Sequence, residues 1–307
     1  MLRIASIGEC MIELSETAEA AGGSGGMTRT FGGDTLNTAI YLARSLGAAE
    51  AAVHYVTALG DDPFSAEMLA AWQREGLDTG QVLRLPGKLP GLYIIRTDAA
   101  GERTFHYWRS AAAARELLGD GRPEALAAGL KGFDLIYLSG ITLGILDAES
   151  RKRLFALLAE LKRGGSRIAF DTNYRPRLWR DRAEAQEAVT RALQLADLAL
   201  PTFDDEVALF ADRAPEATAA RLHALGVEEV VVKCGAEPCL ISQGGRPPAR
   251  VAGETVARPV DTTAAGDSFN GAYLAARLAG AEATTAARAG HRLAARVIAT
   301  KGAIIPA

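Results

Sequence analysis

The chain of 307 residues is 49% hydrophobic and 23% charged, a composition typical of a globular protein with a large buried core. Its net charge of −3 gives no reason to expect a nucleic acid or an anionic membrane as a partner. The three cysteines have neither a disulfide nor a metal spacing, and no apolar run nears the roughly 20 residues of a membrane span. We therefore expect a cytoplasmic protein with reduced thiols.

Strand and helix patterns alternate along most of the chain. Short apolar runs predict buried strands, and amphipathic segments closed by glycine predict helices. This alternation predicts a mostly parallel sheet covered by helices on both faces, with ligands at the carboxyl ends of the strands. The predicted strands cover 2–7, 52–58, 134–139, 167–171, 198–201 and 230–233. The predicted helices cover 34–46, 64–75, 150–163, 183–195, 215–225, 266–278 and 283–299.

One region departs from the alternation. The extended runs 92–97 and 103–109 flank a turn sequence at 98–101, which predicts a β-hairpin with no helix between its strands. Further strands are expected within 11–16 and 21–31. We therefore expect a single domain, 1–307, that carries a small β-sheet lid built from about 9–31 and 88–110.

The segment 261–269 reads DTTAAGDSF and opens a predicted helix. The first N–H groups of a helix are unpaired and carry partial positive charge, and small residues such as Ala264, Ala265 and Gly266 let an anion come close to them. Asp267 would repel a bound phosphate if the loop only held phosphate. It fits a base that takes a proton from a hydroxyl while the N–H groups hold a transferring phosphoryl group. The segment therefore predicts phosphoryl transfer to an alcohol.

Two other segments carry candidate groups for the alcohol substrate. A glycine pair precedes a helix at 34–46, so the backbone of Gly33 with the side chains of Asp34 and Asn37 could bind hydroxyl groups. Alternatively, Asp34 is only the N-cap of that helix. On the hairpin, Tyr93 and Tyr107 are either substrate contacts or cross-strand packing. Arg109 shares a face with Tyr107 and could hold a carboxylate.

Polar residues also follow the later strands. Asn173 could approach phosphate or metal, and Arg175 an anionic group. Glu206 could support Mg²⁺ through water, or it complements the N-terminus of a helix. Lys233 ends another strand and could approach nucleotide phosphates. Arginines in an acidic chain favour a small anionic substrate.

These motifs together resemble those of the ribokinase-like, or PfkB, carbohydrate kinases. The C-terminal signature of that family, Asp-x-x-small-Gly-Asp-x-Phe, is matched from the neighbourhood of Asp261 to Phe269, and its N-terminal Gly-Gly element is matched by Gly32 and Gly33. The chain is most similar to the 2-keto-3-deoxygluconate kinase branch of the family. The segments that carry this resemblance are 7–14, 32–37, 90–93, 101–105, 107–109, 173–179 and 302–306.

The resemblance implies a ribokinase-like three-layer α/β/α sandwich that uses ATP and Mg²⁺ to phosphorylate the sugar acid at its terminal hydroxyl, giving 2-keto-3-deoxy-6-phosphogluconate. It makes Asp267 the base and assigns the backbone anion hole to Ala264, Ala265 and Gly266. We also expect a homo-oligomer, a dimer or higher, since an exposed apolar face of the lid would favour pairing, and a monovalent cation stays open. The residues expected at the sugar acid are Gly33, Asp34, Asn37, Tyr93, Tyr107, Arg109 and Arg175. Those expected at the nucleotide are Asn173, Lys233, Gly235 and Thr262, with Glu206 at the metal.

Two departures from the family pattern stand out. Many relatives have glycine where this chain has Ala264, and many have asparagine where Phe203 stands three residues before Glu206. Two alternatives also stay open at this point. One is a kinase of the same type with another acceptor, such as fructose, ribose or 2-keto-3-deoxygalactonate. The other is a non-catalytic protein that senses a sugar or a nucleotide.

Overall fold

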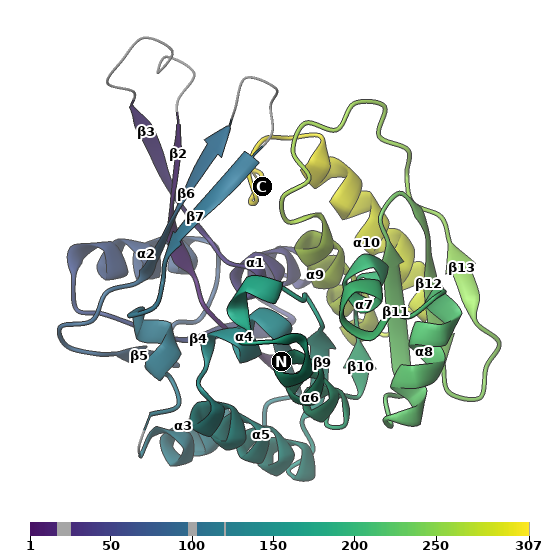
Figure 1. The fold of residues 1–307 in the computed structure, drawn as a ribbon, viewed down its shortest axis with the longest axis horizontal. Coiled ribbons are helices and arrows are strands. Elements are labelled where there is room, and N and C mark those ends of the chain that lie inside the picture. Colours follow the sequence, from purple (N-terminus) through teal and green to yellow (C-terminus); the bar gives the residue numbers. More distant parts are fainter. Residues whose placement is uncertain (17–25, 98–102, 120, 307) are drawn as a thin grey trace.

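A large, mostly parallel sheet forms the centre of the protein in the computed structural model, which describes residues 1–16, 26–97, 103–119 and 121–306 (Figure 1). Its strand order is β13-β12-β11-β10-β9-β8-β1-β4-β5. The strands from β5 to β11 pair in parallel, and β12 and β13 add an antiparallel edge. The strands are β1 (Leu2–Ile7), β4 (Ala51–Leu59), β5 (Val82–Arg84), β8 (Leu135–Ser139), β9 (Arg167–Asp171), β10 (Leu198–Ala199), β11 (Glu229–Cys234), β12 (Glu237–Gln243) and β13 (Ala249–Val251).

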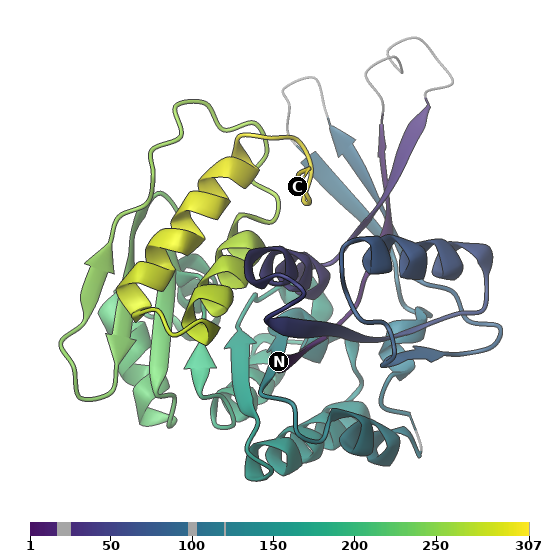
Figure 2. The same ribbon diagram turned by 180° about the vertical axis from the view of Figure 1, so that it is seen from behind.

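Helices cover both faces of this sheet, so the predicted three-layer α/β/α sandwich is confirmed. One face carries α1 (Asp34–Leu46), α2 (Pro63–Arg74), α9 (Ala265–Leu278) and α10 (Ala283–Ile298), which lie in front in Figure 2. The other face carries α3 (Arg122–Leu130), α4 (Gly140–Ile145), α5 (Ala148–Arg163), α6 (Arg182–Leu193), α7 (Phe203–Phe210) and α8 (Pro215–Ala224).

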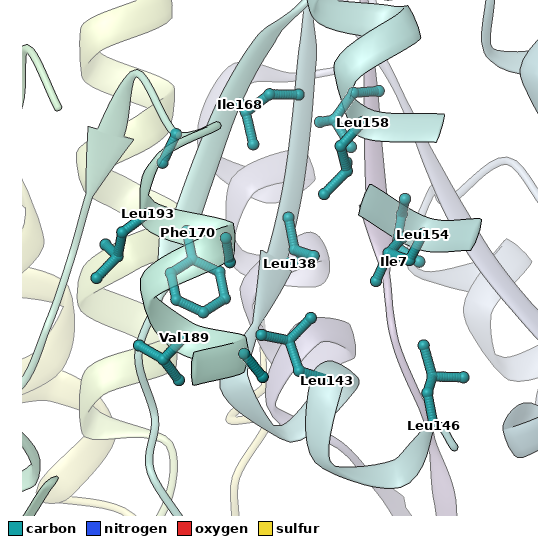
Figure 3. Close-up of a cluster of buried hydrophobic side chains, with 14 of the residues drawn as sticks. Ile7, Leu138, Leu143, Leu146, Leu154, Leu158, Ile168, Phe170, Val189 and Leu193 are labelled. Carbon is teal, nitrogen blue, oxygen red and sulfur yellow. The ribbon is translucent and has the colours of Figure 1, made fainter. Parts of the chain in front are cut away.

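Strand β8 shows why the central strands are apolar throughout. Its side chains alternate between two cores, because successive residues of a strand point to opposite faces of the sheet. Leu138 packs in the core beneath α5 and α6, where Figure 3 shows it near Phe170 and Leu143. Its neighbour Tyr137 packs in the opposite core with α1 and α9. A strand buried on both faces needs no polar positions.

A second sheet stands beside the carboxyl ends of the main strands (Figure 1). It has the order β3-β2-β6-β7, with β2 (Met11–Glu16), β3 (Met27–Gly32), β6 (Gly91–Thr97) and β7 (Arg103–Trp108). The hairpin prediction is confirmed by the antiparallel pair β6–β7, in which Tyr93 lies opposite Tyr107. The turn at 98–101 and residues 21–25 of the glycine-rich segment lie outside the described residues. We refer to this second sheet as the lid.

Some details differ from the predicted elements. The N-cap of α1 is Gly33, and Asp34 is the first helical residue, with no side-chain cap on the helix. Asp34 instead accepts a hydrogen bond from Asn173, so the cap interpretation of this residue was wrong. The sequence pattern did not predict α3, α4, α7, β5, β12 and β13, since these elements are short or lie at an edge of the fold.

Two features bear on the expected setting of the protein. Cys10, Cys234 and Cys239 are free thiols, with no disulfide among them. Over the described ranges, none of the helices is long and apolar enough to cross a membrane.

Candidate active site

The loop before α9 is fastened to the C-terminal segment of the chain by one buried carboxylate. Asp261 accepts hydrogen bonds from the backbone N–H groups of Thr263 and Gly302, both at 2.9 Å. The backbone N–H of Asp261 itself donates to the carbonyl of Ile298 at the end of α10, at 3.1 Å. These hydrogen bonds give the loop before α9 a fixed conformation.

The first turn of α9 presents unpaired backbone donors. Ala264, the N-cap, has a left-handed conformation with φ of 60°, and no side chain caps the helix. The N–H of Ala265 donates to the carbonyl of Thr262 at 3.3 Å. This turn leaves the N–H groups of Gly266 and Asp267 as the donors that face a ligand, at the positive end of the helix dipole.

Asp267 is held by helix α1, which packs against α9. The side-chain amide of Asn37 donates to Oδ2 of Asp267 at 2.9 Å, and the hydroxyl of Thr38 donates to its carbonyl oxygen at 3.3 Å. Burial raises the pKa of Asp267 to about 7, and the negative charge of Asp34 adds to the effect. A carboxylate with this pKa is a suitable general base at neutral pH.

Asp34, whose negative charge acts on Asp267, begins helix α1. The side-chain amide of Asn173 donates to Oδ2 of Asp34 at 2.8 Å, and burial also raises the pKa of Asp34. Asn173 has a positive φ of 32° directly after β9. The structure therefore brings together four residues that the sequence singled out in three separate segments: Asp34, Asn37, Asn173 and Asp267.

Lys233 lies beneath the loop before α9. Its ammonium group donates to Oδ2 of Asp171 at 2.9 Å and to Oδ1 of Asn270 at 3.1 Å. The amide of Asn270 also donates to Asp171, at 2.7 Å. The ammonium group is 3.5 Å from the place that a Cβ on Gly266 would occupy. Because an ammonium group has three N–H donors, one of them is left over for a ligand.

Sequence reasoning assigned no role to two members of this group. Asp171 ends β9, at the sheet edge where ligands were expected, and Asn270 lies one helical turn beyond Asp267. Both positions could have been found from the helical and strand periods, since each places a polar side chain beside a predicted site residue.

The lid contributes an aromatic face to the site. Tyr93 packs against Tyr107 with ring centroids 5.7 Å apart, and its hydroxyl donates to Glu13. The guanidinium of Arg109 lies 5.7 Å from the ring centre of Tyr107 and forms an ion pair with Glu9. The expected face with Tyr107 and Arg109 side by side is confirmed by these contacts.

Arg175 follows β9 and lines the same cleft. It forms an ion pair with Asp205 at 3.3 Å, and one of its N–H groups donates to the carbonyl of Tyr174 at 2.8 Å. Its side chain is 52% exposed, so the ion pair with Asp205 is solvated and weak. The exposed guanidinium of Arg175 is therefore open to an anionic ligand as well as to Asp205.

These residues line one cleft of about 2160 Å³ between the lid and the carboxyl ends of the main strands. The predicted site residues that line it are Gly33, Asp34, Asn37, Tyr93, Tyr107, Arg109, Asn173, Arg175, Lys233, Thr262, Ala264, Ala265, Gly266 and Asp267.

Two predicted residues lie apart from the lining. Gly235 is exposed in the turn between β11 and β12, with φ of 60°. Glu206 is fully buried on α7, where Oε2 accepts from Arg221 while Oε1 has no hydrogen-bond partner. Burial raises its pKa to about 7. The described residues hold no cluster of three or more acidic, histidine or cysteine side chains that could bind a metal ion.

Known proteins resemble this chain over its whole length. The 2-dehydro-3-deoxygluconokinase of Escherichia coli K12 is 49% identical over 309 aligned positions, which cover 99% of this chain and 97% of the relative. The enzyme of the same name from Dickeya dadantii is 48% identical, with 99% and 96% covered. A 2-dehydro-3-deoxygluconokinase is the enzyme also called 2-keto-3-deoxygluconate kinase.

Solved structures agree on the fold. The PfkB protein from Polaromonas sp. JS666 superimposes with a TM-score of 0.84 at 26% identity, and 99% of this chain and 97% of that chain are covered. A putative ribokinase II from Escherichia coli, in complex with ATP and Mg²⁺, gives a TM-score of 0.85 at 22% identity, with 99% and 94% covered. The ribokinase-like fold is therefore confirmed. The family model for the pfkB carbohydrate kinases matches residues 1–307, and the chain belongs to that family.

Proposed function

We propose that this protein phosphorylates 2-keto-3-deoxygluconate at its terminal hydroxyl, with ATP as the donor and 2-keto-3-deoxy-6-phosphogluconate as the product. The proposal rests on two side chains that line the same cleft: Asp267, a carboxylate at a helix N-terminus, and Arg109, an arginine of the lid. The first suits transfer to a hydroxyl, and the second suits an acceptor that has a carboxylate. The high identity to enzymes of this name supports the same conclusion.

In the proposed reaction Asp267 takes the proton of the terminal hydroxyl as the hydroxyl oxygen bonds to the γ-phosphorus of ATP, and the bond from that phosphorus to the oxygen of the leaving ADP breaks. Its pKa near 7 leaves it largely ionised at slightly alkaline pH, and Asn37 fixes one of its carboxylate oxygens. The loop formed by Ala264, Ala265 and Gly266 opens α9, where the unpaired backbone N–H groups of Gly266 and Asp267 would face the charge that develops on the phosphoryl group. The positively charged ammonium group of Lys233 lies beside the same loop, and one of its N–H groups is not used by Asp171 or Asn270.

The acceptor would lie under the lid. Gly33 offers its backbone, while Asp34 and Asn37 offer polar side chains suited to hydroxyl groups. Tyr93 and Tyr107 would cover the carbon chain of the sugar acid. The carboxylate would bind to Arg109, and the exposed Arg175 would supply a second positive charge.

The residues near the strand ends fit a kinase that binds magnesium together with its nucleotide. Mg²⁺ in such sites keeps several waters and needs only one or two carboxylates besides the phosphates, so the absence of a cluster in the described residues is compatible with it. Bound Mg²⁺ would neutralise charge on the phosphates. Glu206 is the proposed contact through water, although it lies outside the cleft lining and its Oε2 is bonded to Arg221. Asn173 and Thr262 are proposed at the phosphates and Gly235 near the rest of the nucleotide.

We further propose that the protein is a homo-oligomer that associates through the outer face of the lid and acts in the cytoplasm. Trp108 points away from its neighbour Tyr107 on β7 and is 58% exposed, although it also borders the cleft. Light scattering coupled to size-exclusion chromatography tests the association. A Trp108→Glu variant should be monomeric, and an unchanged oligomer would exclude this face.

A panel of acceptors tests the proposed function. Purified protein is assayed with ATP and Mg²⁺ on 2-keto-3-deoxygluconate, 2-keto-3-deoxygalactonate, fructose and ribose, with the product identified by mass. The highest kcat/KM is expected for 2-keto-3-deoxygluconate. A preference for fructose would instead make the protein a fructokinase, the name of relatives that are 26% to 30% identical. Binding without turnover on any acceptor would favour a sensor.

A further inference from the structure

The contact between Glu9 and Arg109 is unusual because it is buried and incomplete. Glu9 is 2% exposed, and the side chain of Arg109 is 13% exposed. Nη2 of Arg109 donates to Oε2 of Glu9. Oε1 of Glu9 and Nε of Arg109 are both buried and both lack a hydrogen-bond partner. An unpaired buried polar atom lowers the stability of the fold, so these two atoms need a structural reason.

The geometry of the guanidinium supplies one. Arginine has five N–H donors arranged along two edges, and each edge can hold a carboxylate through two parallel hydrogen bonds. The side edge consists of Nε and Nη2, and the end edge consists of Nη1 and Nη2. The unpaired Nε and Oε1 are the two atoms that would complete a two-bond pair between Glu9 and the side edge of Arg109.

Such a pair leaves the end edge of Arg109 available for a second carboxylate. Arg109 lines the cleft, and so does Arg115, whose positive charge acts on Glu9. Asp34 also acts on Glu9, with a negative charge, so binding of an anionic ligand here depends on the free edge of Arg109 and on Arg115. Glu9 alone would repel that ligand, but as a partner of Arg109 it fixes the direction of the guanidinium.

Glu9 is itself held in place by the backbone. Its carbonyl oxygen lies 2.2 Å from the position that a Cβ on Gly33 would occupy, and its Oε1 lies 3.0 Å from the corresponding position on Gly91. Gly33 belongs to the proposed acceptor site, and Gly91 begins strand β6 of the lid. A side chain at position 33 would collide with the backbone of Glu9, and one at position 91 would crowd its carboxylate.

We propose that Glu9 is a positioning residue for sugar-acid recognition: it holds the side edge of Arg109 and thereby turns the end edge toward the carboxylate of the acceptor. This inference rests on the proposed function. It concerns a residue that touches Arg109 and not the acceptor, so its effect must pass through Arg109.

A double-mutant cycle tests it. Glu9→Gln keeps the size of the side chain, removes its charge and turns an amide donor toward Arg109. We expect the KM for 2-keto-3-deoxygluconate to rise roughly 10-fold or more while kcat changes little, as for the loss of one charge-assisted hydrogen bond in binding. In an Arg109→Ala background the same substitution should add less than about twofold to KM, because Glu9 no longer has a partner to orient.

The control is Glu184→Gln, which removes the charge from another partly buried ion pair, Arg151–Glu184, away from the cleft lining. It should leave KM unchanged even if it lowers the melting temperature. If Glu9→Gln fails to fold, Glu9→Asp keeps the charge but shortens the reach, and a several-fold rise in KM is expected. A retained KM in the soluble variant would overturn the inference.

The outcomes separate this inference from the proposed function. If Arg109→Ala raises KM but Glu9→Gln does not, or if the two effects add, Glu9 is not a positioning residue while the function stands. If neither substitution changes KM, Arg109 does not recognise the carboxylate, and both the inference and that part of the proposed function fail.

Discussion

Replacing Asp267 with asparagine should lower activity and raise stability in the same molecule. The carboxylate is kept ionised in a poorly hydrated place beside Asp34, which raises its pKa from 3.8 to about 7. A rise of about 3 pKa units means that ionised Asp267 lowers the free energy of unfolding by at most about 4 kcal/mol. Asparagine has nearly the same shape, and its Oδ1 can still accept the hydrogen bond from Asn37.

The sign of the effect depends on pH. Because the pKa is raised in the folded state, the native protein carries no penalty below a pH of about 4 and the full penalty above a pH of about 7. The stabilisation by Asp267→Asn should therefore grow between pH 5 and pH 8. At pH 8 we expect the melting temperature to rise by about 5 °C or more, given roughly 2 °C per kcal/mol for a large domain.

Turnover should change in the opposite direction. Loss of the base is expected to lower kcat by on the order of 10²-fold or more, with KM for the acceptor largely kept. In the wild-type protein, kcat/KM should fall about tenfold per pH unit below a pH of about 7, as Asp267 becomes protonated. Steady-state assays and calorimetry across the same buffers measure both effects.

Asp147→Asn provides a control of opposite sign. Asp147 caps α5, and a hydrogen bond from the backbone N–H of Ser150 lowers its pKa. Its contribution to stability is present above the ordinary pKa of aspartate and is lost as the pH falls through the lowered value. The variant should be slightly less stable at pH 8 with normal turnover. Near-normal turnover of Asp267→Asn, or an equal change in its melting temperature at pH 5 and pH 8, would refute the reasoning.

Three further substitutions test how the loop and its supports are built. Ala264→Gly should stabilise the protein by about 1 kcal/mol in denaturant titrations, because φ of 60° strains alanine; a loss of stability would contradict this conformation. Gly271→Ala should destabilise the protein by about 1 to 3 kcal/mol, since the new Cβ would lie 2.8 Å from the Cβ of an α1 side chain. As a control, the Cβ of Gly129→Ala would meet only a flexible glutamine side chain, so this substitution should be tolerated. Lys233→Met should destabilise the protein by about 3 to 5 kcal/mol, because Asp171 stays buried without its counter-charge. Adding Asp171→Asn should restore much of the lost stability. If thermal melts instead show that the two substitutions destabilise additively, the two side chains are not coupled.

Much of the fold follows from local patterns in the sequence. A strand buried on both faces must be apolar at every position, so β8 was recognisable from its run of residues alone. Helix α9 was recognisable from its period and from the small residues at its start. The lid hairpin was visible because two extended runs had no room for a helix between them. In each case the signal lies within about a dozen neighbouring residues.

The site was only partly predictable, and Lys233 shows why. As a lone lysine at a strand end it was assigned to nucleotide phosphates, but its ammonium group is bound by Asp171 and Asn270, residues that lie 62 and 37 positions away. Partners of this kind depend on which strands become neighbours. The parallel pairing of β9, β10 and β11 and the position of α9 above them decide it, and no local pattern encodes either.

The sequence by itself determined the alternation of elements, the loop with its aspartate and the arginine of the lid. The tertiary structure decided which chemistry those residues can perform. Asp267 becomes a base with a pKa of about 7 because folding removes water from it and brings it beside Asp34, 233 positions earlier in the chain. Arg109 gains a direction because folding buries it against Glu9, 100 residues away. Desolvation and pairing are properties of the packed chain, so only the folded protein gives these side chains their chemistry.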